Sequence, residues 1–74
     1  MKRYQRVHEA VRAYDVFARK SRPEALRMVG TVVAPDADRA CVYARATYDE
    51  ERWVEMRIVP TDAMITVWAP GDDA

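Results

Sequence analysis

The helical pattern of residues 36–48 limits the fold more than any other feature of the sequence, because its apolar stripe is built mostly of alanine. The stripe recurs at spacings of three and four residues, as Ala37, Ala40, Cys41, Ala44 and Tyr48. Asp36 can cap the free amide groups of a first helical turn. Small side chains allow a helix to lie close against a sheet, but such a helix covers little area. We therefore expect one narrow helix packed on a sheet, with Cys41 as a buried structural thiol.

Alternating apolar and polar residues predict strands on both sides of this helix. The expected strands span residues 13–20, 26–34, 52–59 and 62–69. Pro23 lies in a polar stretch that predicts a turn between the first two strands, and Gly30 predicts a bulge or a close backbone approach. The sequence thus predicts an α+β fold, in which a small antiparallel sheet of two β-hairpins packs on one helix in the order β-β-α-β-β.

The second predicted hairpin would bring the two tryptophans of the chain together. A loop over residues 59–62 would place Met56 opposite Ile65 and Trp53 opposite Trp68. Both indoles would then lie on the more polar face of this hairpin, away from its apolar side.

Length and charge restrict the class of protein. A chain of 74 residues, 50% hydrophobic and 32% charged, is expected to fold as one domain over residues 13–69, between a basic N-terminal arm (1–12) and a polar tail (70–74). Twelve Lys and Arg balance twelve Asp and Glu, so strong nucleic-acid binding is not expected. Basic residues concentrate in 1–27 and acidic residues in 28–74. The basic half would attract an acidic partner, or the two halves would align subunits head to tail. The third alternative is that each charge simply lies on a solvated surface.

Residues suited to catalysis or metal binding are few. Cys41 is the single cysteine and His8 the single histidine, so neither an internal disulfide nor a typical zinc site is expected. No nucleophile lies beside a base in the sequence, and no glycine-rich loop could cradle a phosphate. We therefore expect no catalytic, cofactor-binding or metal-binding residues and no enzyme activity. No apolar stretch has the length of a signal-peptide core or a membrane span, which predicts a cytoplasmic protein without membrane contact.

The two faces of the predicted sheet carry more apolar area than one helix can cover. We expect the uncovered face to dock on another protein or on a second copy of the chain, as in a homodimer or another homo-oligomer. The expected interface residues are Trp53, Trp68, Arg57, Glu55, Phe17 and Arg19. The alternative is that the basic arm folds back over the tryptophans and closes the core within a monomer.

Several blocks of the sequence carry a resemblance to a known family. They are Tyr14-Asp15-Val16-Phe17-Ala18-Arg19, Met28-Val29-Gly30-Thr31, the helical residues 36–48 with Ala40, Ala44, Arg45 and Tyr48, and Met56-Arg57-Ile58-Val59. In order and spacing they resemble the small B subunit of the phenylacetate-degradation oxygenase, the multicomponent phenylacetyl-CoA epoxidase. Met28 and Arg57 stand where that family has histidine and tryptophan. The resemblance implies a subunit that bridges the di-iron catalytic and companion subunits, without a metal or flavin of its own.

The expected function is therefore a non-catalytic accessory or scaffold subunit of a multicomponent di-iron oxygenase acting in phenylacetate (aromatic acid) degradation. One alternative is a small stand-alone α/β binding module whose basic arm engages RNA or another polyanion, with an affinity that falls steeply as salt is added. A second alternative, a small homo-oligomeric enzyme, would need titratable groups that converge between subunits.

Overall fold

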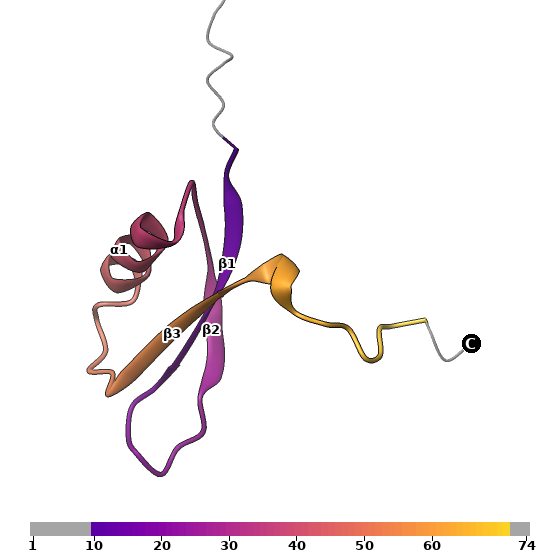
Figure 1. Cartoon of the computed structure of the whole chain (residues 1–74). Coiled ribbons are helices and arrows are strands. Elements are labelled where there is room, and N and C mark those ends of the chain that lie inside the picture. The colour runs from indigo at the N-terminus through magenta and orange to yellow at the C-terminus, as the bar shows by residue number, and fades with distance from the viewer. Residues whose placement is uncertain (1–9, 72–74) are drawn as a thin grey trace, which may run out of the picture.

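The computed structural model describes residues 10–71, which form a three-stranded antiparallel sheet with one helix on one face (Figure 1). The elements are β1 (Arg12–Arg19), β2 (Arg27–Ala34), α1 (Ala37–Thr47), β3 (Glu55–Pro60) and a 3₁₀ turn (Thr61–Ala63). The strand order is β2-β1-β3, so β1 lies in the middle and pairs with both neighbours. The predicted α+β class, with a small antiparallel sheet packed on one helix, is confirmed.

The fourth strand expected over residues 62–69 is absent from the described part of the chain. After β3 the chain makes the 3₁₀ turn and then runs away from the sheet (Figure 1). β3 pairs with β1 rather than with the residues that follow it. The prediction of a second hairpin is therefore wrong, and Trp53 does not pair with Trp68, nor Met56 with Ile65.

Side-chain contacts hold the 3₁₀ turn against β1 and explain this path. The Thr61 hydroxyl donates to Asp15 Oδ1 at 2.9 Å, and the Thr31 hydroxyl donates to the same oxygen at 3.1 Å. Arg12 Nη2 donates to Asp62 Oδ1 at 2.9 Å. Asp15 is only 5% exposed, and leaving a buried acceptor unpaired costs about 1–3 kcal/mol. The buried Asp15 carboxyl group therefore fixes the direction in which the chain leaves β3.

The core lies between α1 and the sheet. Its buried side chains are Tyr14, Val16, Ala18, Val32, Ala34, Ala40 and Ala44, against which Val29, Tyr48, Met56 and Ile58 pack. Asp36 Oδ1 accepts a hydrogen bond from the Arg39 N–H at 2.8 Å, which confirms the predicted N-cap. Cys41 is exposed, so the prediction of a buried thiol is wrong. Cys41 lies about 100° around the helix from the buried Ala40. It is therefore outside the narrow strip of α1 that contacts the sheet.

Gly30 lies directly beside the side chain of Tyr48. A Cβ at position 30 would collide with the hydroxyl group and the ring of Tyr48. The close approach predicted at this glycine is therefore confirmed, although it is a side chain from the end of α1 that comes near rather than a second backbone segment.

A β-bulge changes which side chains of β2 share a face. The register between β1 and β2 shifts between Val16 and Phe17. Met28 consequently lies opposite Phe17, on the face turned away from α1, whereas Val32 is buried on the helix side. Without the bulge, the alternation of a strand would place Met28 and Val32, four residues apart, on the same face.

The described residues include only part of the predicted arm and tail. Residues 1–9 and 72–74 lie outside them, and so does the predicted closure of the basic arm over the tryptophans. Arg12, predicted as the last residue of the arm, is the first residue of β1. Among residues 10–71, no helix combines the length and the apolar character needed to cross a membrane.

Candidate docking surface

The face of the sheet opposite α1 is called the open face below. Among residues 10–71 no helix or strand packs on it, and only the 3₁₀ turn contacts β1 near Asp15 (Figure 1). Side chains directly opposite each other on antiparallel strands share a face. By this register the open face carries Ala13, Asp15, Phe17 and Arg19 of β1, Met28, Thr31 and Val33 of β2, and Glu55, Arg57 and Val59 of β3.

Large apolar side chains of the open face remain in contact with solvent. Met28 is 50% exposed and Val33 is 55% exposed. Phe17 lies on the central strand, with Met28 opposite it on one side and Arg57 on the other. This row places an aromatic ring, a flexible thioether and a guanidinium group next to one another across the sheet.

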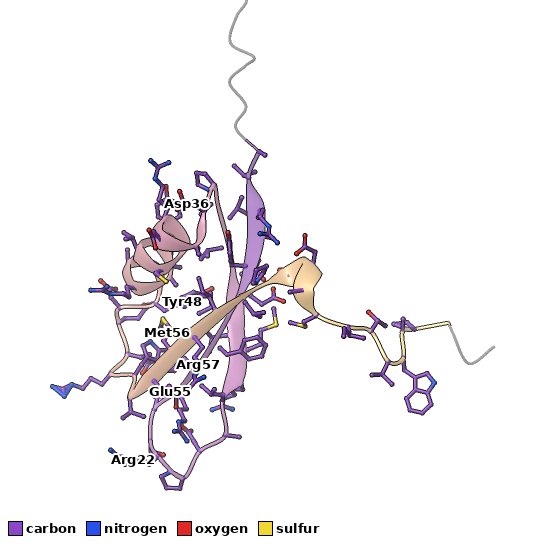
Figure 2. The ribbon with its side chains drawn as sticks, viewed as in Figure 1. Arg22, Asp36, Tyr48, Glu55, Met56 and Arg57 are labelled. Carbon is purple, nitrogen blue, oxygen red and sulfur yellow. The ribbon has the colours of Figure 1, made fainter. Side chains whose placement is uncertain are left out.

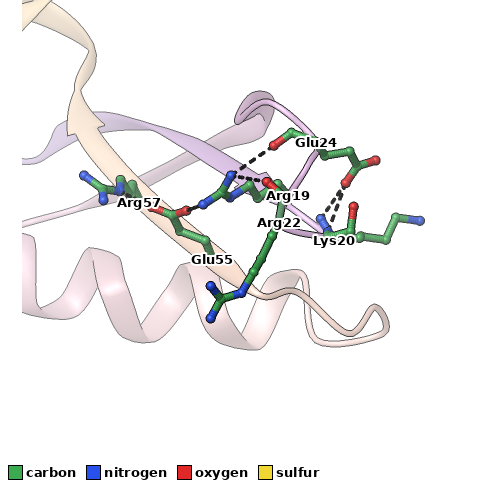
Figure 3. A network of polar contacts seen from close by, with 7 residues as sticks. Arg19, Lys20, Arg22, Glu24, Glu55 and Arg57 are labelled. Carbon is green, nitrogen blue, oxygen red and sulfur yellow. Dashed lines mark hydrogen bonds and ion pairs between the residues drawn. The ribbon is translucent and has the colours of Figure 1, made fainter.

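Arg19, Glu55 and Arg57 form a charged cluster at one end of the open face (Figure 3). Arg19 Nη2 lies 2.6 Å from Glu55 Oε1, and Arg57 Nε donates to Glu55 Oε2 at 2.6 Å. The hydrogen bond from Arg57 and the charge of Arg19 together outweigh burial and lower the pKa of Glu55. The Arg57 side chain is 70% exposed, against 30% for Arg19. Arg57 is therefore the member of the cluster that a partner could reach most easily.

Arg19 also fixes the loop between β1 and β2 (Figure 3). Its Nη1 donates to the carbonyl oxygens of Arg22 at 2.7 Å and Glu24 at 3.1 Å. Glu24 Oε1 accepts from the backbone N–H of Lys20 at 2.7 Å and of Ser21 at 3.3 Å. The hydrogen bond from Lys20 is the main reason that the pKa of Glu24 is lowered. These contacts confirm the predicted turn and keep the charged end of the open face in place.

Trp53 lies by the end of α1 and not beside Trp68. Its Nε1 donates to the Tyr48 carbonyl oxygen at 2.6 Å, just after the last helical turn. It lines a groove between the C-terminal end of α1 and the start of β3, together with Arg45, Asp49, Arg52, Val54 and Met56. Because residue 53 precedes β3, the alternation predicted for residues 52–59 does not place its indole.

Trp68 belongs to a segment that leaves the body of the molecule. Residues 64–68, called the C-terminal segment below, extend away from the sheet (Figure 1). Ile65 is 88%, Val67 81% and Trp68 80% exposed. Of the predicted interface residues, the structure therefore brings Phe17, Arg19, Glu55 and Arg57 together on the open face, while Trp53 and Trp68 lie elsewhere.

Among the open-face residues that the predicted interface left out, Met28 and Asp15 are the most informative. Met28 reaches this face through the bulge beside Gly30, where the sequence predicted a bulge or a close approach, but the alternation of β2 was not corrected for it. Asp15 had a visible signal, because an acidic residue between Tyr14 and Val16 in an otherwise apolar strand must find partners when buried. Its partners Thr31 and Thr61 are far from it in the sequence.

The open face carries an aromatic ring, a thioether, guanidinium groups and carboxylates. In the part of the chain that the structure describes, no three His, Cys, Asp or Glu side chains are placed to hold a metal ion. Aromatic rings, methionine and arginine, as found on the open face, are the side chains enriched at protein interfaces. Comparisons with family models, with curated proteins and with solved structures found no match for this chain.

Proposed function

We propose that the protein is a non-catalytic accessory subunit that docks through its open face onto the catalytic and companion subunits of a di-iron oxygenase of aromatic-acid degradation. The observation that carries this proposal is the row formed by Met28, Phe17 and Arg57 across the open face. These side chains offer a central apolar anchor beside a cation, an arrangement that interface hot spots use.

The energy of covering this face supports a docking role. Fully burying a methionine or valine side chain contributes about 1.5–3 kcal/mol. Met28 and Val33 are each about half exposed. Covering both therefore contributes about the free energy of burying one whole side chain. The core of a domain this small supplies about 3–5 kcal/mol net. The free energy gained by covering this face is therefore a large fraction of the free energy of unfolding of the chain.

The choice of partner rests on the resemblance to the B subunit of phenylacetyl-CoA epoxidase. Three of the resembling blocks lie on the three strands of the sheet, residues 14–19 on β1, 28–31 on β2 and 56–59 on β3. Each block contributes one member of the row, Phe17, Met28 and Arg57, of which Met28 and Arg57 stand where the family has histidine and tryptophan. Blocks that are distant in the sequence thus meet on the face that we propose for docking.

The experiment mixes the purified full-length chain with the catalytic and companion subunits of a phenylacetyl-CoA epoxidase from the same host and measures affinity by calorimetry. Met28→Glu should weaken binding at least tenfold, because an unpaired charge buried in an interface costs more than about 1.4 kcal/mol. Val42→Glu is the matched control. Val42 is exposed to a similar degree, 58%, but lies on α1, so affinity should stay unchanged.

Two results would contradict the proposal. One is the lack of a complex at micromolar concentration, and the other is a Met28→Glu complex as tight as that of the unchanged chain. Binding of RNA that weakens steeply with salt would instead favour the stand-alone module. That module depends on the basic arm, most of which lies outside the described residues.

A further inference from the structure

The C-terminal segment has the composition of a strand that pairs with another strand. Its residues, Met64, Ile65, Thr66, Val67 and Trp68, are mostly β-branched, aromatic or apolar. No charged residue occurs from 63 to 71, in a chain of which 32% is charged. Charges and prolines normally protect an exposed strand from pairing with another chain. A segment that extends into solvent without a single charge is suited to such pairing.

The structure also offers an edge that such a strand could join. β3 is an outer strand of the sheet, bonded to β1 on one side only. Its other edge faces no strand among residues 10–71, so it presents backbone N–H and C=O groups that an added strand would pair.

The segment is directed away from the β3 edge of its own chain. Thr61 and Asp62, which precede it, are held to β1, on the paired side of β3, by the contacts with Asp15 and Arg12. The predicted hairpin would turn at residues 59–62, but there the Thr61 hydroxyl and the Asp62 carboxylate are bonded to β1. The tight hairpin that the alternation of residues 52–69 predicts is therefore blocked within one chain.

A shallow apolar groove runs along the free edge of β3 on the helix side. Cys41, Ala44, Arg45, Met56 and Ile58 line it, and Figure 2 shows Met56 between α1 and β3. Alternate residues of a strand share a face, so Ile65 and Val67 point to the same side of the C-terminal segment. An antiparallel strand added at this edge can thus place both side chains over Met56 and Ile58.

We propose that the C-terminal segment of one copy adds as an antiparallel strand to the free edge of β3 in a second copy, with Ile65 and Val67 in the groove beside Cys41. The exchange is reciprocal and gives a two-fold symmetric homodimer with a four-stranded sheet in each half. The open face stays uncovered in this dimer, so the inference is independent of the proposed function.

A second copy fits this edge because the segment and the edge are complementary and occur on the same chain. Ile65 and Val67 share one side of the segment, as Met56 and Ile58 share the helix side of β3. In a two-fold exchange, each chain gives its C-terminal segment and receives that of its partner at β3. Both segments and both β3 edges are then occupied, so the assembly ends at two chains.

Cross-linking through the native thiol tests the arrangement directly. Cys41 is the only cysteine and lies in the groove. In Ile65→Cys, mild oxidation should join Cys41 of one chain to the introduced thiol of the other, giving a dimer on a non-reducing gel that mass spectrometry assigns to this pair. Val33→Cys, equally oxidised, is the control, because Val33 lies on the open face and should not reach Cys41. A disulfide within one chain, no disulfide, or equal cross-linking of the control would overturn the proposal.

Sedimentation gives a second, independent readout. The unchanged full-length chain should sediment at twice 8.5 kDa at micromolar concentration. Ile65→Asp should raise the dimer dissociation constant at least tenfold without changing the circular dichroism spectrum, because Ile65 is 88% exposed within one chain. Val42→Asp on α1 should leave the dissociation constant unchanged. A monomeric unchanged chain, or an Ile65→Asp variant that dimerises equally well, would show that the segment does not mediate association.

Discussion

Gly30 and Tyr48 couple the sheet to the end of the helix through a single close contact. Tyr48 caps α1, packs beside Gly30 of β2, and accepts the indole hydrogen bond of Trp53 through its carbonyl group. One residue thus links β2, the end of α1 and the connection to β3. Glycine in a strand predicted this close approach, whereas the position of Trp53 depends on a carbonyl group that no residue pattern identifies.

Gly30→Ala should destabilise the protein by about 1–3 kcal/mol, the usual cost of adding a group to a packed site. The added methyl group meets the Tyr48 hydroxyl and ring, so Tyr48 must move from the core. Urea unfolding measures the change. In the Tyr48→Phe background the loss should be smaller, because the hydroxyl nearest to the new methyl group is gone. Equal losses in both backgrounds would mean that the Tyr48 hydroxyl is not the obstacle.

The strands and the helix were largely predictable because each has its own periodicity. The predicted strands 13–20 and 26–34 correspond to β1 and β2, and the alanine stripe corresponds to α1. Alternation in residues 62–69 predicts which side chains share a face but not that the chain leaves the sheet after β3. The contact that decides this, between Thr61 and Asp15, joins residues 46 positions apart. Local patterns carry no information about such a contact.

The ion pair of Glu55 with Arg19 joins the ends of β1 and β3 and should make stability depend on pH. The hydrogen bond from Arg57 and the charge of Arg19 lower the pKa of Glu55 below its ordinary value. A carboxylate with a lowered pKa in the folded state stabilises the fold above its unfolded-state pKa, about 4.3. This contribution is lost as pH falls through the folded-state pKa.

The urea concentration at which half of the protein is unfolded, measured between pH 7 and pH 3, tests this dependence. Glu55→Gln should lower the midpoint at pH 7 and flatten its decline in acid, since the substituted amide does not titrate. Glu50→Gln, at an exposed position after α1, should keep the steeper decline of the unchanged chain. A Glu55→Gln variant with the same decline would show that this carboxylate does not contribute to acid sensitivity.

At the scale of the molecule, the one helix among residues 10–71 covers only one face of the sheet. From the alanine stripe, the sequence predicted that one helix covers less apolar area than the sheet carries. The exposed Met28 and Val33 on the open face agree with this prediction. The sequence did not predict the division into two surfaces, the open face and the C-terminal segment. That division follows from the missing fourth strand, which separates Trp68 from the charged cluster of Arg19, Glu55 and Arg57.

The strand order β2-β1-β3 has a practical consequence for handling the protein. A three-stranded sheet has two outer edges, and the proposed strand exchange occupies only the edge of β3. Among residues 10–71 no strand then covers the outer edge of β2. Concentrated or partly unfolded samples should therefore grow into filaments by stacking along β2. Thioflavin fluorescence after mild heating would reveal this growth, and Val33→Lys, at an exposed position of β2, should slow it.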